Sequence, residues 1–189
     1  VEQHVHNIDV FLWMSGYKVA KATGFGARHR RITGDQYDQF SIDFEMENGV
    51  HLHSMCRQID GCSNAVGEII YGTKGSWNSF DHEIKDLDGN VVWKFDNEKA
   101  ETEFRQHNPY VLEHVDLVNH IRKGEPIDEA TACAMSTLAG VMGRTAAYTG
   151  DTVSWDDMSQ SEMDYLPEKL EIGPMDMSGY TVQVPGKAK

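Results

Sequence analysis

The chain has few basic residues for its many acidic ones. Its 189 residues contain 17 Lys and Arg against 30 Asp and Glu, which gives a formal net charge of −13 at pH 7. Nucleic acids and anionic membranes both bind basic surfaces, so this deficit argues against either partner. Long apolar runs are also lacking, since no stretch approaches the roughly 20 residues of a membrane-spanning helix. The hydrophobic share, 40%, suffices for the core of one domain.

Cysteine is scarce as well. Cys56, Cys62 and Cys133 are an odd number without C-x-x-C spacing. We expect free, buried thiols, with a disulfide between Cys56 and Cys62 as the less favoured alternative, because reducing compartments rarely keep such bonds. The cytoplasm is therefore the favoured compartment, and the periplasm stays open if a signal peptide precedes Val1.

The N-terminal segment, residues 1–16, is predicted to form a helix. It contains no Pro and ends at Gly16, and a Gly just past the last apolar residue is a common helix stop. On a helix, Glu2, His6 and Asp9 fall within roughly 60° of one another. The other sides carry apolar residues: Val1, Val5, Ile8, Phe11 and Leu12. Two carboxylates and an imidazole therefore share one stripe of an otherwise apolar helix.

Two interpretations of this stripe are open. A buried charge is costly unless it is paired or hydrogen-bonded, so Glu2 and Asp9 are expected to have partners. A carboxylate four residues before His6 fixes the imidazole tautomer and raises its basicity, which suits a general acid/base. In the structural alternative, Asp9 caps or salt-bridges a neighbouring element. The spacing alone favours this structural network, because such networks bury charges as well.

Histidine pairs suggest metal binding, but neither pair has the required surroundings. On a helix, His4 and His6 would point about 200° apart and could not bind one ion. His51 and His53 would share one face of a strand, yet no third ligand accompanies them at a supporting spacing. The sequence therefore predicts no metal site.

Segments that favour strands follow in hairpin order. Residues 39–46 alternate apolar and polar side chains, and residues 50–57 return after Asn48-Gly49, the strongest two-residue hairpin signal. Residues 97–106 are highly charged, and we expect a loop or a poorly paired edge there. Further strands are expected at residues 18–27, 65–71, 76–80 and 152–155, and as a hairpin at residues 84–95.

Two helices are predicted late in the chain. Asn108 is a good N-cap and Pro109 suits a first turn, and apolar residues then recur at helical spacing up to Gly124. Asp128 is expected to cap the last helix, which ends at Gly150. Strands in hairpin order followed by helices predict an α+β fold with helices on one face of an antiparallel sheet. The expected buried stripe of the last helix consists mostly of small residues: Ala130, Ala134, Leu138, Val141, Met142 and Ala146.

The N-terminal stripe also resembles a family motif. Glu2, His6 and Asp9 resemble the acid-x-x-x-His-x-x-Asp signature that opens the second domain of the Gfo/Idh/MocA oxidoreductases, the family of glucose-fructose oxidoreductase and inositol dehydrogenase. Glu2 stands where the family commonly has Asp. Further segments resemble landmarks of one branch of the family, in order: residues 24–28, 37–40, 48–50, 56–61, 72–75, 108–110 and 143–150.

The resemblance implies the C-terminal domain of a longer enzyme. Family members begin with a nucleotide-binding Rossmann half that carries a Gly-rich turn and a Glu-Lys-Pro motif, and neither is found here. We expect residues 1–164 to form the α+β domain, with a large, mostly antiparallel open β-sheet and helices packed on one face. Residues 165–189 would form its extended C-terminal arm. The family also implies a homo-dimer or tetramer through the uncovered sheet face.

The resemblance implies a function as well. The complete protein would be an NAD- or NADP-dependent dehydrogenase that acts on a sugar, polyol or sugar derivative, with the cofactor bound mainly by the missing half. His6 would be the acid/base residue and the contact to the nicotinamide, Glu2 would orient His6 or bind a hydroxyl, and Asp9 would support the helix or His6. This portion alone would be inactive. The candidate substrate-binding residues are Arg28, Tyr37, Arg57, Gln58, Tyr110 and His114.

Two alternatives stay open. The chain could be a non-catalytic binding or scaffold module, although a scaffold has no need for titratable groups within an apolar helix. Relatives in the family also recycle the nicotinamide during glycoside hydrolysis or epimerisation, and the sequence does not separate these reactions from dehydrogenation. Product analysis separates them, because recycling gives turnover without net reduced nicotinamide.

Overall fold

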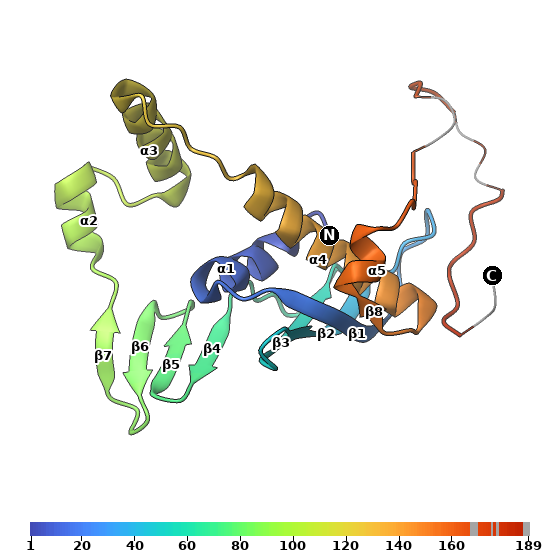
Figure 1. The fold of residues 1–189 in the computed structure, drawn as a ribbon, viewed down its shortest axis with the longest axis horizontal. Coiled ribbons are helices and arrows are strands. Elements are labelled where there is room, and N and C mark those ends of the chain that lie inside the picture. Colours follow the sequence, from blue (N-terminus) through green and yellow to red (C-terminus); the bar gives the residue numbers. More distant parts are fainter. Residues whose placement is uncertain (167–169, 175, 177, 187–189) are drawn as a thin grey trace. The chain divides into compact units, whose positions relative to one another are not determined.

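The chain divides into two compact units. The computed structural model describes residues 1–166, 170–174, 176 and 178–186, apart from the side chain of Ala100. The first unit consists of Val1–Ser63 and Ala132–Lys189, and the second unit of Asn64–Thr131. Each unit contains a four-stranded antiparallel sheet, which together with the helices confirms the α+β class (Figure 1). The predicted arm, residues 165–189, lies partly outside the described residues.

The sheet of the first unit has the strand order β3-β2-β1-β8. The predicted hairpin is confirmed, since Gly49 turns with φ +79° and Glu45 pairs with His51. The elements of this unit are helix α1 (Val5–Ser15), strands β1 (Val19–Ala27), β2 (Gln39–Met46) and β3 (His51–Arg57), most of helix α4 (Ala130–Thr149), strand β8 (Val153–Ser154) and helix α5 (Trp155–Ser159).

Helices α1 and α4 pack on one face of this sheet, as predicted (Figure 1). Alternate side chains of β2, namely Ile42, Phe44 and Met46, are buried on that face. Gly143 allows α4 to approach closely, because a Cβ at this position would lie 2.9 Å from the Phe44 ring. The core of the first unit therefore lies between the two helices and the central strand.

The second unit has a sheet of strand order β4-β5-β6-β7. The strands thus form two sheets, where one large sheet was expected. Residues 58–68, between β3 and β4, contain no strand, so the succession of hairpins is interrupted there. The elements of this unit are β4 (Ile69–Gly72), β5 (Gly75–Asn78), β6 (Glu83–Asp86), β7 (Val91–Lys94) and helices α2 (Asn97–Phe104) and α3 (Pro109–Lys123).

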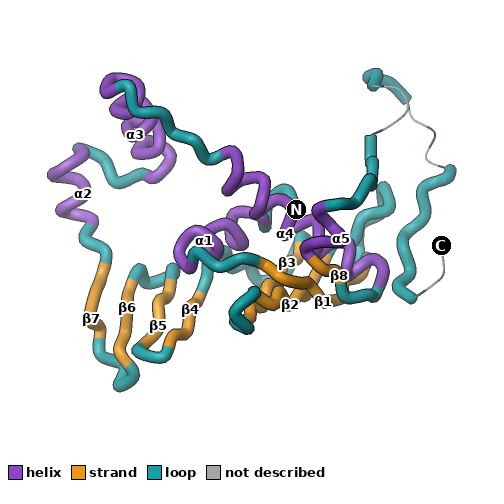
Figure 2. The backbone as a smooth tube through the Cα atoms, in the orientation of Figure 1, coloured by secondary structure: helices purple, strands orange, loops and turns teal. Residues whose placement is uncertain are grey.

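The prediction of a loop or edge at residues 97–106 is wrong, because helix α2 occupies this segment (Figure 2). Asp96 is its N-cap, and the Asp96 side chain accepts a hydrogen bond from the backbone N–H of Lys99. Glu98 lies in the first turn, where the helix dipole favours a negative charge. The charged residues that suggested a loop are good helix formers, and the cap starts the helix.

The predicted buried stripe of α4 is confirmed in part. Met142 and Ala146 are fully buried, whereas Ala130 and Ala134 are exposed. The other buried residues of α4 are Ser136, Ala139, Gly140, Gly143 and Ala147.

The described helices include none that is long and apolar enough to cross a membrane.

Two glycines let β1 approach β2 closely. A Cβ at Gly24 would lie 2.5 Å from the carbonyl oxygen of Ser41 and 2.8 Å from the Cα of Ile42. A Cβ at Gly26 would lie 2.6 Å from the carbonyl oxygen of Gln39. Backbone atoms inside a paired sheet cannot move aside at low cost. Glycine at these two positions therefore serves the packing of two strands.

We expect Gly24→Ala to destabilise the first unit by about 1–3 kcal/mol, the usual cost of forcing an added methyl into a filled space. Gly140→Ala is the control, because a Cβ there would meet Val1 at an ordinary 3.5 Å. Alanine is also about 1 kcal/mol better than glycine inside a helix. Urea unfolding measures both changes. If Gly24→Ala were as stable as the parent chain, the two strands could not be this close.

Candidate functional site

The candidate acid/base residue, His6, lies exposed on the first turn of α1. The helix begins at Val5, so Glu2 precedes it in a turn, and Gly16 ends it with the predicted left-handed conformation. Glu2 is also exposed, and within the described part of the chain no ion pair joins it to His6. The structure therefore presents both side chains outward without pairing them.

Asp9, the third member of the predicted stripe, is tied to α4. Its Oδ1 accepts a hydrogen bond of 2.5 Å from the Ser136 hydroxyl. Ser136 is only 2% exposed, so this bond also satisfies a hydroxyl that is shielded from water. The structural alternative has Asp9 cap or salt-bridge a neighbouring element, and its observed partner on α4 is a serine hydroxyl instead.

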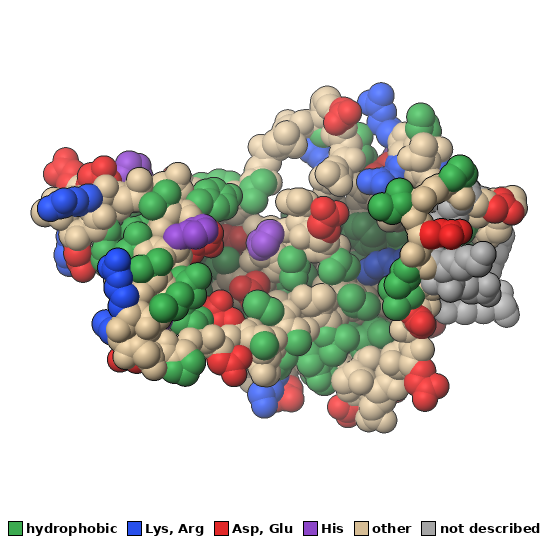
Figure 3. Space-filling view, turned by 90° about the horizontal axis from the view of Figure 1, so that it is seen from above, with side chains coloured by type: hydrophobic (Ala, Val, Ile, Leu, Met, Phe, Trp, Pro, Cys, Tyr) green, Lys and Arg blue, Asp and Glu red, His purple; other side chains and the backbone are tan. Residues whose placement is uncertain are grey.

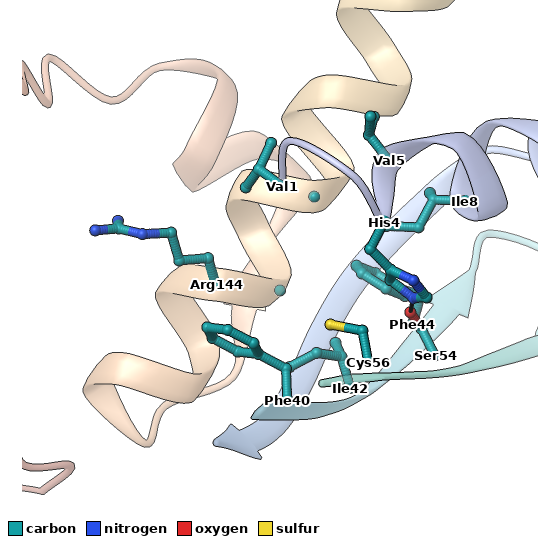
Figure 4. A pocket seen from close by; sticks show the side chains of 12 residues that line it. Val1, His4, Val5, Ile8, Phe40, Ile42, Phe44, Ser54, Cys56 and Arg144 are labelled. Atoms are coloured by element: carbon teal, nitrogen blue, oxygen red, sulfur yellow. Dashed lines mark hydrogen bonds between the residues drawn. The ribbon is translucent and has the colours of Figure 1, made fainter. Parts of the chain in front are cut away.

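A pocket lies on the inner side of the first turn of α1 (Figure 4). His4 points into it, and its Nε2 lies 2.6 Å from the hydroxyl oxygen of Ser54 on β3. The pocket volume is about 30 Å³, which leaves room for one or two water molecules and none for a sugar ring. The lining residues include Val1, Val5, Ile8, Phe40, Ile42, Phe44, Cys56, Gly140 and Gly143.

Cys56 and Arg144 line this pocket, but neither functional group is placed to react within it. Burial raises the pKa of the Cys56 thiol, which keeps it protonated and a poor nucleophile. The Arg144 guanidinium points away from the pocket (Figure 4) and stacks on the rings of Tyr148 and Tyr165, at 4.4 Å and 4.7 Å from their centroids. The pocket thus consists mainly of packed apolar side chains, and the bond between His4 and Ser54 is a polar contact within it.

Arg28, a predicted substrate contact, holds a loop together. Its guanidinium donates hydrogen bonds to the carbonyl oxygens of Arg31 at 2.5 Å and Gly34 at 2.6 Å. The same loop wraps around the buried carboxylate of Asp38, which accepts hydrogen bonds from the backbone N–H groups of His29, Arg30 and Arg31. Burial alone would raise the pKa of Asp38, but these donors outweigh burial and lower it from 3.8 to about 2.

Tyr37 is a core residue in the structure. It is 6% exposed, its hydroxyl donates to the carbonyl oxygen of Gln183 at 2.8 Å, and its ring packs against the edge of Tyr148. Burial raises its pKa, and the neighbouring Tyr148 adds to the increase. A substrate contact by Tyr37 would require Gln183 to release its hydroxyl.

The remaining predicted substrate residues are exposed and belong to two different units. Arg57 donates to the carbonyl oxygen of Ser63 at 2.9 Å, and Gln58 follows it at the end of β3. Tyr110 and His114 belong to α3 of the second unit, where the His114 ring contacts the Tyr110 carbonyl oxygen at 2.7 Å. Within the first unit, Arg28 and Tyr37 flank one loop, and none of the predicted residues lines the pocket.

The histidine pair on β3 has other partners. His51 lies 2.7 Å from the carboxylate of Asp43, and His53 lies 3.3 Å from the hydroxyl of Ser41. Among the described residues there is no group of three or more His, Cys, Asp or Glu side chains placed to hold a metal ion.

Solved structures with a similar fold are sugar and polyol oxidoreductases. The myo-inositol 2-dehydrogenase of Lactobacillus plantarum has a TM-score of 0.58 and 19% identity over 82% of this chain and 47% of its own. The scyllo-inositol dehydrogenase of Lactobacillus casei, solved with NAD(H) and scyllo-inositol, has a TM-score of 0.58 and 17% identity over 79% and 46%. The aldose-aldose oxidoreductase of Caulobacter crescentus, complexed with glycerol, has a TM-score of 0.61 and 12% identity over 80% of this chain and 45% of its own.

These neighbours are oxidoreductases of the Gfo/Idh/MocA type. The chain shares their fold. It spans about half the length of the structures that it matches. No protein-family model matches the sequence, and no curated protein matches it.

We expect Asp38→Asn to destabilise the first unit by about 1–3 kcal/mol, because an amide replaces a buried carboxylate that accepts three backbone hydrogen bonds. Asp35→Asn, in the same loop, is the control. The folded-state pKa lies below the ordinary value, so the stability that Asp38 contributes is present above about pH 4 and is lost as the pH falls towards 2. Urea unfolding at pH 7 and pH 3 tests this prediction. An equal loss of unfolding free energy in Asp38→Asn at both pH values would contradict it.

Proposed function

We propose that this chain is the C-terminal domain of a Gfo/Idh/MocA oxidoreductase, an NAD(P)-dependent dehydrogenase of a sugar, polyol or sugar derivative. The observation that carries the proposal is the exposed His6 on the first turn of α1, within a fold shared with inositol dehydrogenases. The motif around His6 and the fold shared with inositol dehydrogenases support the same reaction class.

His6 would act as the general acid/base. A bound nicotinamide cofactor supplies the hydride acceptor, and the residues of this chain would handle the proton. His6 takes the proton from the substrate hydroxyl, and Glu2 binds a neighbouring hydroxyl or orients the imidazole. Asp9 supports the helix through its bond to Ser136. Because Glu2 and His6 are exposed and unpaired with each other, both are accessible to a ligand.

The outer face of α1 supports a site at this place. Trp13 lies seven residues after His6, which puts the two side chains within about 20° of each other around the helix. Trp13 is 80% exposed and Met14 is 45% exposed. Large apolar side chains open to water mark a contact surface. Figure 3 shows that the view it draws also has other hydrophobic side chains at the surface. We propose that the outer face of α1 contacts the nucleotide-binding half and the substrate.

We propose different roles for the six candidate substrate-binding residues, according to how exposed each side chain is. Arg57, Gln58, Tyr110 and His114 are exposed and accessible to a ligand. Arg28 and Tyr37 are engaged in the loop and the core, so their role would be to hold the surrounding structure in place.

We also propose a homo-oligomer through the uncovered sheet face of the first unit. Phe25, Ser41 and Met55 are paired across β1, β2 and β3 on this face. Phe25 is 70% exposed and Met55 is 68% exposed.

We expect light scattering to give at least a dimer. Phe25→Asp should weaken this association, because it places a charge among apolar contacts. A parent chain that stays monomeric at high concentration would contradict the proposal.

The central test is His6→Ala in the complete enzyme. Loss of a general acid/base lowers turnover by roughly 10² to 10⁴. His107→Ala is the matched control, because His107 is an exposed histidine whose ion pair with Glu101 lies in the second unit. Initial rates of nicotinamide reduction with inositols and aldoses as substrates measure both variants. An unchanged rate for His6→Ala would rule out the acid/base role.

A further inference from the structure

We infer that His4 is a positioning residue, whose bond to Ser54 fixes the first turn of α1 and thereby directs His6 outward. The anchoring follows from the contacts of this chain alone, and only its effect on catalysis rests on the proposed function. Neither residue belongs to the predicted stripe of Glu2, His6 and Asp9.

The first turn of α1 is held by backbone hydrogen bonds of unequal length. The bond from the Val5 nitrogen to the Val1 carbonyl oxygen is 3.0 Å long. The N–H of His6 lies 3.4 Å from the carbonyl oxygen of Gln3, and the N–H of Ile8 lies 3.4 Å from that of His4. Both distances exceed the usual range of about 2.7–3.2 Å. His4 is the N-cap residue, and its side chain makes no capping hydrogen bond to the helix. A contact from outside the helix therefore adds to what holds the turn that carries His6.

Ser54 supplies a rigid support. It is 7% exposed and sits in β3 opposite Ile42 of the central strand β2. A buried hydroxyl needs a hydrogen-bond partner, and the His4 Nε2 at 2.6 Å provides one. Figure 4 shows the His4 ring reaching from the start of α1 down to the Ser54 hydroxyl. The bond joins residues that are 50 positions apart in the sequence.

The direction of His4 determines the direction of His6. His4 already has right-handed helical backbone angles, φ −76° and ψ −11°. Side chains two residues apart on a helix point about 200° from each other. Once His4 is bound to the sheet on the inner side, His6 must face away from it. A rotation of the turn that released His4 would carry His6 towards the core.

Hydrogen–deuterium exchange of the 189-residue chain tests the anchoring. His4→Ala should speed exchange of the amides of residues 5–8 by roughly three- to tenfold, the effect of losing one hydrogen bond. His4→Gln should retain most of the protection, because its side-chain amide reaches a similar position. Ser41→Ala is the control, because it removes the partner of His53 on the exposed face of the same strands. Unchanged exchange at residues 5–8, or equal acceleration throughout the first unit, would overturn the inference.

Kinetics of the complete enzyme test the effect on His6. We expect His4→Ala and Ser54→Ala to lower kcat about tenfold with little change in KM, and His4→Gln to restore most of kcat. An equal loss in Ala and Gln variants, or a change in KM alone, would overturn the positioning role. The proposed function fails separately, because it requires the loss of turnover in His6→Ala, whereas the exchange experiment does not depend on turnover.

Discussion

The placement of α1 depends on two hydrogen bonds to buried serine hydroxyls. His4, at the start of α1, is bound to Ser54 on β3. Asp9, in the second turn, is bound to Ser136 on α4, so the two bonds tie α1 to two different elements. Both serines are shielded from water and would be costly to leave unpaired. The inner face of the helix is therefore fixed to the core of the first unit, and its outer face, with His6 and Trp13, is left for contacts outside this unit.

Close backbone packing maintains the core to which α1 is tied. Gly24 allows β1 to lie against β2, and Gly143 allows α4 to lie against Phe44. A larger side chain at Gly24 would push β1 away from β2, and one at Gly143 would push α4 away from the sheet. Either shift would alter the framework that holds Ser54 and Ser136. The orientation of α1 thus depends on Gly24 in β1 as well as on Gly143, which lines the pocket under its first turn.

Local patterns in the sequence predicted the elements well where they carried strong signals. Alternation and Asn48-Gly49 predicted the β2–β3 hairpin, and Asn108, Pro109 and Gly124 predicted α3, because these residues determine the backbone directly. The prediction for the charged segment of α2 is wrong because the cap at Asp96, which starts the helix, outweighs the irregular charge pattern. The spacing of His4 and His6 in the sequence suggests only a metal pair, and gives no sign of the bond to Ser54. Ser54 is distant from His4 in the sequence, and no local pattern indicates which strand a helix will lie on.

The most direct test of the central claim is a ligand-bound structure of the complete enzyme with a nicotinamide cofactor and a polyol substrate. The quantity to measure is the distance from the reacting hydroxyl oxygen to the nearer imidazole nitrogen of His6. We predict about 2.6–3.2 Å, within reach of direct proton transfer. A substrate bound away from the outer face of α1, with His6 in contact with neither the hydroxyl nor a bridging water, would contradict the claim.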